Sequence, residues 1–193
     1  MNTTRLEAFS DGVIAIIITI MVLEIHVPDA ANWESLEHLA PILFGYLLSF
    51  AFVGIYWISH HHLLHAAKTV NPGILWANLN LLFWLSLVPV STAWMNKTNF
   101  ITFSVVVYAV LLLLCGLSFN ILQIAISKSL PNDSAIKEAV KLKGKSLFSI
   151  LAYTLAIPAA YYNTAISLFL FAIVALAWIV PSKVFENELG GEN

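Results

Sequence analysis

Two acidic residues bracket an apolar segment near the start of the chain. Asp11 and Glu24 enclose twelve uncharged residues, 12–23. Twelve helical residues rise only about 18 Å, whereas the hydrocarbon core of a membrane is roughly 30 Å thick. If this helix crosses a membrane, at least one carboxylate lies near or within the membrane, where it must face protein or water. The pair therefore predicts a helix at the centre of a bundle, away from lipid.

A cluster of four histidines is the second candidate for chemistry; its members are His60, His61, His62 and His65. Imidazoles bind metals and take up protons near neutral pH. A zinc site needs ligands that converge tetrahedrally, and a di-iron membrane enzyme needs several histidine clusters, but only His26 and His38 lie outside this one. We therefore expect no metal site, no cofactor, no soluble substrate and no enzymatic activity, and interpret the cluster as a helix cap or pH-sensitive group.

The composition indicates the class of protein. Of 193 residues, 60% are hydrophobic and only 10% are charged, whereas soluble domains carry about 25% charged residues. The net charge of -2 argues against nucleic acid as a partner. We predict an all-α, polytopic membrane protein whose main surroundings are the lipid bilayer.

Gaps between charged residues predict six transmembrane helices in a single unit, residues 1–193. They lie in residues 5–25, 38–67, 74–95 and 100–127, with two more in 146–182 separated by a hairpin at Tyr161, Tyr162 and Asn163. A short interfacial helix is expected near Trp33, Leu36 and Leu39, which have helical spacing. Residues 128–145 are expected to form a cytoplasmic loop, and residues 186–193 a flexible tail.

The basic residues predict the orientation in the membrane. With six helices, eight of the nine Lys and Arg residues fall on one side, and only Lys97 falls on the other. Because basic residues concentrate on the cytoplasmic side, both termini are expected to be cytoplasmic.

Counting 100° per residue separates two faces of the first helix. One face carries Phe9, Gly12, Ile16, Ile20 and Leu23, with Thr19 on its flank. The opposite face carries Asp11, Ile14, Ile18, Met21 and Ile25. A packed core on both faces is the alternative that this pattern leaves open.

The first helix also begins with an unusual motif. Arg5, Phe9, Ser10 and Asp11 spell R-x-x-x-F-S-D, followed by an isoleucine-rich run. This motif resembles the transmembrane protein 175 family of potassium channels. Animal members carry two six-helix units; the prokaryotic members carry one and assemble as homotetramers. The resemblance implies that the first helix of each subunit lines the pore.

The resemblance also implies roles for individual residues. In that family, bulky apolar side chains a few residues after the motif constrict the pore. Ile16 is then the narrowest ring, Ile20 and Leu23 follow it, and Thr19 adds a polar ring. Contacts to neighbouring helices hold the motif, so Asp11 is expected to be structural. The predicted orientation puts Trp57, His60, His61, Asn78 and Asn80 at the same depth as Asp11, and His60 or His61 is its favoured partner.

The functional expectation is a cation channel that passes potassium in preference to sodium, in the plasma (inner) membrane of a prokaryote. The sequence contains no TVGYG filter loop, so discrimination is expected to come from the apolar constriction. Potassium ions are expected to permeate this pore without any cofactor. The alternative is a proton-coupled secondary transporter in which Asp11 and the histidine cluster relay protons.

Overall fold

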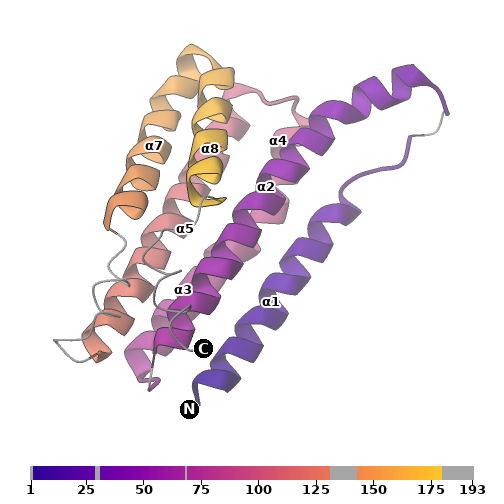
Figure 1. Ribbon diagram of the computed structural model, residues 1–193. Helices are drawn as coiled ribbons and strands as arrows, with labels where there is room; N and C mark the ends of the chain where they lie inside the picture. The colour runs from indigo at the N-terminus through magenta and orange to yellow at the C-terminus, as the bar shows by residue number, and fades with distance from the viewer. Residues whose placement is uncertain (1, 29–30, 68, 131–142, 180–193) are drawn as a thin grey trace, which may run out of the picture.

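The structure is a computed structural model that describes residues 2–28, 31–67, 69–130 and 143–179 (Figure 1). Most of the predicted cytoplasmic loop, 128–145, and all of the predicted tail, 186–193, lie outside these residues. Within the described residues every regular element is an α-helix, which confirms the all-α fold class. The helices are α1 (Thr3–Leu23), α2 (Trp33–Ala66), α3 (Pro72–Ser86), α4 (Val88–Lys97), α5 (Thr102–Ser129), α7 (Lys143–Tyr162) and α8 (Thr164–Ile179).

Among the described residues, four segments are long and apolar enough to cross a membrane: α1, α2, α3 together with α4, and α5. The predicted fifth and sixth helices are α7 and α8, which meet at Asn163. The 16 residues of α8 rise about 24 Å, which is slightly less than the thickness of the hydrocarbon core. The chain is therefore a multi-pass membrane protein, and α7 and α8 form a hairpin in which α8 is the shorter helix.

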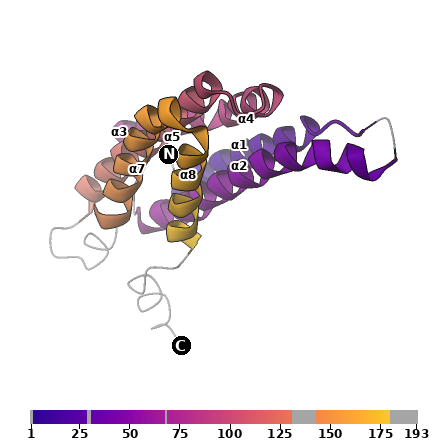
Figure 2. The same ribbon diagram turned by 90° about the horizontal axis from the view of Figure 1, so that it is seen from above.

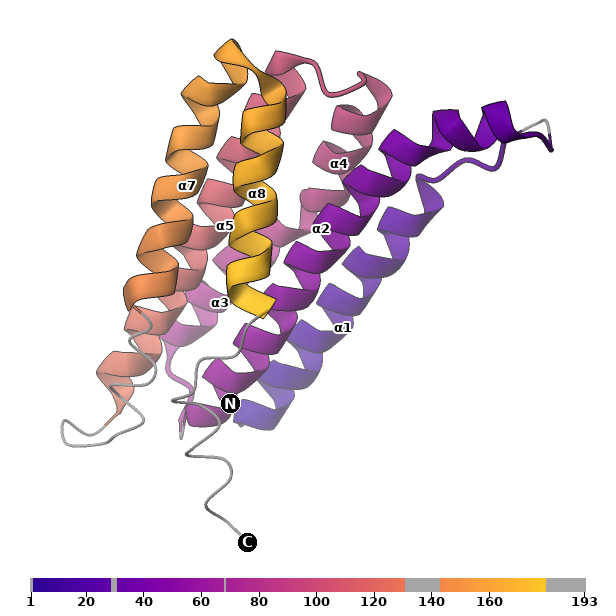
Figure 3. The same cartoon turned by 45° about the horizontal axis from the view of Figure 1, so that its top comes forward.

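The start of α2 differs from the prediction. The expected separate interfacial helix at Trp33, Leu36 and Leu39 is instead the beginning of α2, which runs for 34 residues. The side chain of Asn32 caps this helix by accepting a hydrogen bond from the backbone nitrogen of Ser35 at 2.9 Å. Pro41 lies inside the helix, where a proline removes one backbone hydrogen bond and bends the helix. The first turns of α2 lean away from the other helices (Figures 1 and 3).

The third predicted span is also divided. Helix α3 ends at Ser86 and α4 begins at Val88. Pro89 has no backbone N–H and cannot donate to the carbonyl of Leu85, so the helical hydrogen-bond pattern is interrupted there. Residues 72–97 together are still one candidate membrane span, so the third span predicted over residues 74–95 agrees with the structure and is interrupted within it at Leu87.

Two buried clusters form the core of the bundle. One joins α1, α2, α3 and α5, with Ile14, Leu64 and Leu81 among its members. The other joins α2, α4, α5, α7 and α8 around Tyr108 and Phe171. Seen from above, α1 and α2 extend to one end of the bundle while α7 and α8 lie toward the other (Figure 2). Helix α1 is thus packed on one side only, at the edge of the molecule.

Candidate pore-lining helix

The two predicted faces of α1 differ in burial. The stripe of Phe9, Gly12, Ile16, Ile20 and Leu23 is exposed, with Ile16 at 59% and Leu23 at 75% of full exposure. On the opposite face, Ile14 is only 1% exposed and Met21 is also buried. Asp11, Ile18 and Ile25 are partly buried. Only one face of α1 is packed core within a single chain, and the other is a continuous apolar surface.

Thr19 lies beside this stripe and is also exposed. Its hydroxyl donates a hydrogen bond to the carbonyl oxygen of Ile16 at 2.9 Å. Such a bond to the preceding turn satisfies the hydroxyl's donor within the helix. The polar oxygen of Thr19 is therefore held close to the backbone at the level of Ile16.

Ser10 anchors the opposite face of α1 through a buried hydrogen-bond chain. Its hydroxyl donates to the carbonyl of Leu6 at 2.8 Å and accepts from Asn78 Nδ2 on α3 at 3.0 Å. Asn78 Oδ1 lies 2.7 Å from His60 Nε2 on α2. Because Oδ1 can only accept, Nε2 of His60 carries the proton. Ser10, Asn78 and His60 are all completely buried, so this chain ties three helices together in a low-dielectric environment.

Asp11 has a different partner from the one expected. Its carboxylate accepts a hydrogen bond from the indole nitrogen of Trp57 at 3.0 Å, so the prediction of a histidine partner is wrong. One helical turn from the contact between Trp57 and Asp11, Nδ1 of His61 lies 2.6 Å from Oε1 of Glu7. Glu7 and Asp11 on α1 therefore face Trp57 and His61 on α2 in two parallel pairs.

The sequence analysis placed Trp57 at the depth of Asp11 without making it the partner of that residue, and it missed Glu7. Each stands four residues from a residue already singled out: Glu7 from Asp11, and Trp57 from His61. Residues four apart lie on the same face of a helix, and this spacing is the signal that points to both.

The remaining motif residues and their expected neighbours lie apart from this site. Arg5 and Phe9 are exposed. Asn80 donates to Ser118 on α5 at 2.8 Å and so braces α3 against α5 instead of contacting the motif.

The histidine cluster is organised by ring contacts. His61 stacks on His65 with ring centroids 6.3 Å apart and an angle of 21° between the planes. Among the described residues, no three His, Cys, Asp or Glu side chains converge as a set of metal ligands. Two histidines of the cluster connect α2 to other helices. His60 bonds to Asn78 on α3, and His61 pairs with Glu7 on α1.

Comparison with known proteins agrees with this architecture. The family described as "Endosomal/lysosomal potassium channel TMEM175" matches residues 5–89. A potassium channel of Chryseobacterium sp. (strain P1-3) is 44% identical over 189 residues, which cover 98% of both chains. The chain belongs to the TMEM175 family. Members of this family are channels and not enzymes. Potassium is the ion that permeates, and no cofactor is expected.

A solved TMEM175 homologue shares the fold over almost the whole chain. The crystal structure of a lysosomal potassium-selective channel TMEM175 homolog from Chamaesiphon minutus gives a TM-score of 0.81 at 28% identity, covering 92% of this chain and 96% of that one. The endosomal/lysosomal proton channel TMEM175 of Bos taurus is 38% identical over 96 residues, which are 43% of this chain and 20% of that protein. The Chryseobacterium channel and the Chamaesiphon structure thus match nearly the whole chain, and the animal TMEM175 protein matches part of it.

Proposed function

We propose that this TMEM175 protein is the subunit of a homotetrameric potassium channel in which α1 lines the pore and Ile16 forms the narrowest ring. One observation carries the proposal: the face of α1 that bears Ile16 is apolar and uncovered in a single chain, while the opposite face is anchored in the core. Curated bacterial relatives are named potassium channels, and this supports the choice of ion.

The arrangement of helices supports the assembly. A single helix cannot enclose a pore, so several copies of α1 must surround one axis, and closed rotational symmetry is the usual solution for identical subunits. Helix α1 lies at the edge of the bundle (Figure 1), where its exposed stripe can meet the same stripe of other copies. The buried bonds of Ser10 set the rotation of α1, and so decide that Ile16 faces outward.

The chemistry of the stripe favours discrimination by dehydration. Ile16, Ile20 and Leu23 present no charge and no carbonyl oxygen that could replace water around an ion. An ion that passes an apolar ring must shed part of its hydration shell, and potassium sheds it at a lower cost in free energy than sodium. The same ring can close by dewetting. We therefore expect modest selectivity for potassium over sodium.

We also propose a location and an orientation. The bacterial relatives and the apolar helices favour the plasma membrane of a prokaryote. Eight of the nine basic residues fall on one side of the predicted topology, which favours cytoplasmic termini. Glycosylation or protease-protection tags at the two ends would test this orientation.

The test of the channel compares ion fluxes in liposomes. The purified protein should give fast potassium flux and slower sodium flux, and Ile16→Asn should increase sodium leak by about tenfold because it hydrates the ring; each tenfold change corresponds to about 1.4 kcal/mol. Ile124→Asn is the matched control, since Ile124 is exposed to a similar extent (55%) but lies on α5. Unaltered fluxes in Ile16→Asn, with the oligomer intact, would remove Ile16 from this role. A monomer in native mass spectrometry would contradict the assembly.

A further inference from the structure

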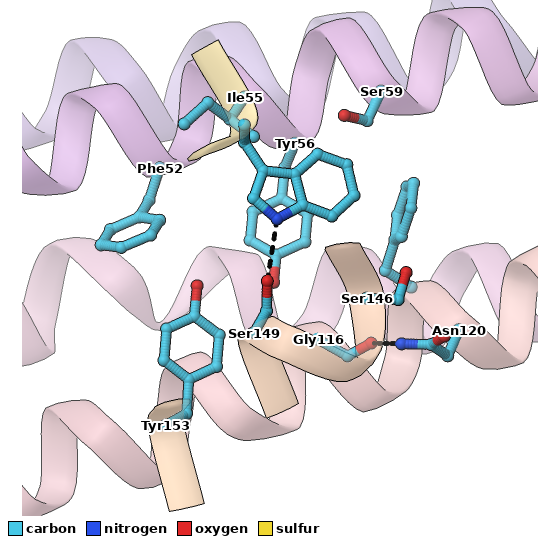
Figure 4. A pocket seen from close by; sticks show the side chains of 11 residues that line it. Phe52, Ile55, Tyr56, Ser59, Gly116, Asn120, Ser146, Ser149 and Tyr153 are labelled. Carbon is cyan, nitrogen blue, oxygen red and sulfur yellow. Dashed lines mark hydrogen bonds between the residues drawn. The ribbon is translucent and has the colours of Figure 1, made fainter. Parts of the chain in front are cut away.

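A small cavity lies inside the subunit, away from α1. It lies between α2, α5, α7 and α8, and its lining includes Phe52, Tyr56, Gly116, Phe119, Tyr153 and Trp178 (Figure 4). The centre of a water molecule can move through about 20 Å³ of this space. One ordered water requires about 10–15 Å³ by the same measure. The cavity therefore has room for a single water molecule.

Two tyrosine hydroxyls reach this cavity without a protein partner. Tyr56 comes from α2 and Tyr153 from α7, on opposite sides of the pocket (Figure 4). Neither hydroxyl hydrogen-bonds to another described residue, whereas the buried hydroxyl of Tyr108 lies 2.8 Å from Ser49 Oγ. Buried hydroxyls nearly always have a hydrogen-bond partner, either protein or ordered water. The two tyrosines therefore require a partner that the cavity can hold.

Two other polar groups beside the cavity are already bonded to the protein. The indole nitrogen of Trp178 donates to Ser149 Oγ at 2.8 Å, and Asn120 Nδ2 donates to the carbonyl of Gly116 at 2.8 Å (Figure 4). These bonds hold the walls in place and leave Tyr56 and Tyr153 facing the space. Ser59 is a further hydroxyl in the lining.

We propose that this cavity is the binding site of one structural water molecule that bridges the hydroxyls of Tyr56 and Tyr153. Each hydroxyl can donate and accept a bond, and two bonds fall within the range of two to four that buried waters make. The bridge joins α2 to α7 next to the edge-to-face contact of Phe52 with Tyr153, whose ring centroids are 6.0 Å apart. Bound water thereby attaches the α7–α8 hairpin to the helix that holds α1.

Gly116 allows a sharp test because it forms part of the cavity wall. A Cβ at Gly116 would lie 3.7 Å from the Tyr56 hydroxyl and 3.8 Å from Tyr153 Cε2, so alanine fits without a clash but takes space from the water. Alanine otherwise favours a helix over glycine. The matched control is Gly54→Ala on α2, where a Cβ meets nothing within 4 Å.

The measurement is thermal unfolding of the purified protein. Gly116→Ala should lower Tm by about 2–4 °C relative to Gly54→Ala, the shift expected when one bridging interaction is lost. In a Tyr56→Phe/Tyr153→Phe background, where the water has lost both partners, Gly116→Ala should no longer lower Tm. A dry cavity predicts the reverse in the wild-type background, namely that Gly116→Ala stabilises at least as much as Gly54→Ala. That result, or a crystal structure that resolves ordered water elsewhere but none between the two hydroxyls, would overturn the proposal.

Discussion

Asn78 Nδ2 on α3 donates a hydrogen bond of 3.0 Å to the hydroxyl of Ser10 on α1. Both residues are completely buried, and the oxygen of the same amide is bonded to His60 on α2. The amide of Asn78 therefore serves three helices at once. It holds α1 at one rotation about its axis, and that rotation leaves Ile16 on the exposed stripe.

Replacing Asn78 should affect both stability and permeation. Asn78→Ala leaves Ser10 and His60 without this partner in a buried environment, where an unsatisfied polar group costs about 1–3 kcal/mol. We expect a lower Tm and, because α1 can then rotate, weaker selectivity between potassium and sodium in liposomes.

Asn80→Ala is the matched control on the same helix. It removes a single bond, that to Ser118 on α5, from a partly buried site. We expect a smaller loss of stability and unchanged selectivity. Equal selectivity changes in both variants would mean that the Ser10 contact does not position α1.

Asp11 should tolerate the loss of its charge better than the loss of its oxygen. Asp11→Asn keeps an oxygen that can accept the hydrogen bond from Trp57, whereas Asp11→Ala removes it. We expect the alanine variant to lose about 1 kcal/mol of unfolding free energy and the asparagine variant to keep most of its potassium flux. Both quantities can be measured on the same preparations, by thermal unfolding and by liposome flux.

The two variants also separate a channel from a proton-coupled transporter. A proton relay needs an ionisable group at residue 11, so a relay would be abolished equally by asparagine and alanine. Loss of all flux in a well-folded Asp11→Asn oligomer would therefore contradict the structural role of this residue.

Gly45 on α2 lies directly against Asn96 on α4. A Cβ at Gly45 would overlap the side-chain oxygen of Asn96, whose nitrogen donates to the carbonyl of Ile42 at 3.2 Å. Gly45→Ala should therefore push the Asn96 side chain aside, weaken its bond to Ile42 and cost about 1–3 kcal/mol, as overpacking of a tight contact does. Thermal unfolding, with Gly54→Ala as the uncrowded control, measures the effect.

The double variant Gly45→Ala/Asn96→Ala tests the cause. It removes the crowded side chain, so part of the lost stability should return despite the missing bond to Ile42. If the double variant is less stable than the sum of the single changes predicts, steric overlap is not the reason.

Local chemistry determined the broad features of this protein. The low share of charged residues requires lipid surroundings, and the gaps between charges locate the apolar helices, because a charge inside hydrocarbon is too costly to occur at random. The 3.6-residue period separated the face of α1 that bears Ile16 from the face that bears Ile14. Both properties are carried by consecutive residues, so the sequence displays them directly.

Contacts between helices decided the rest. The partner of Asp11 is Trp57 because of the way α1 and α2 lie side by side, and the sequence does not state the register between two helices. Pro41 lies within a continuous helix while α3 and α4 separate at Leu87, two residues before Pro89, although each proline lacks the same hydrogen-bond donor. Local chemistry does not separate the two cases, because a proline can either bend or end a helix. Helix α4 packs against α2 and α5, and such contacts between distant segments are set by the tertiary structure.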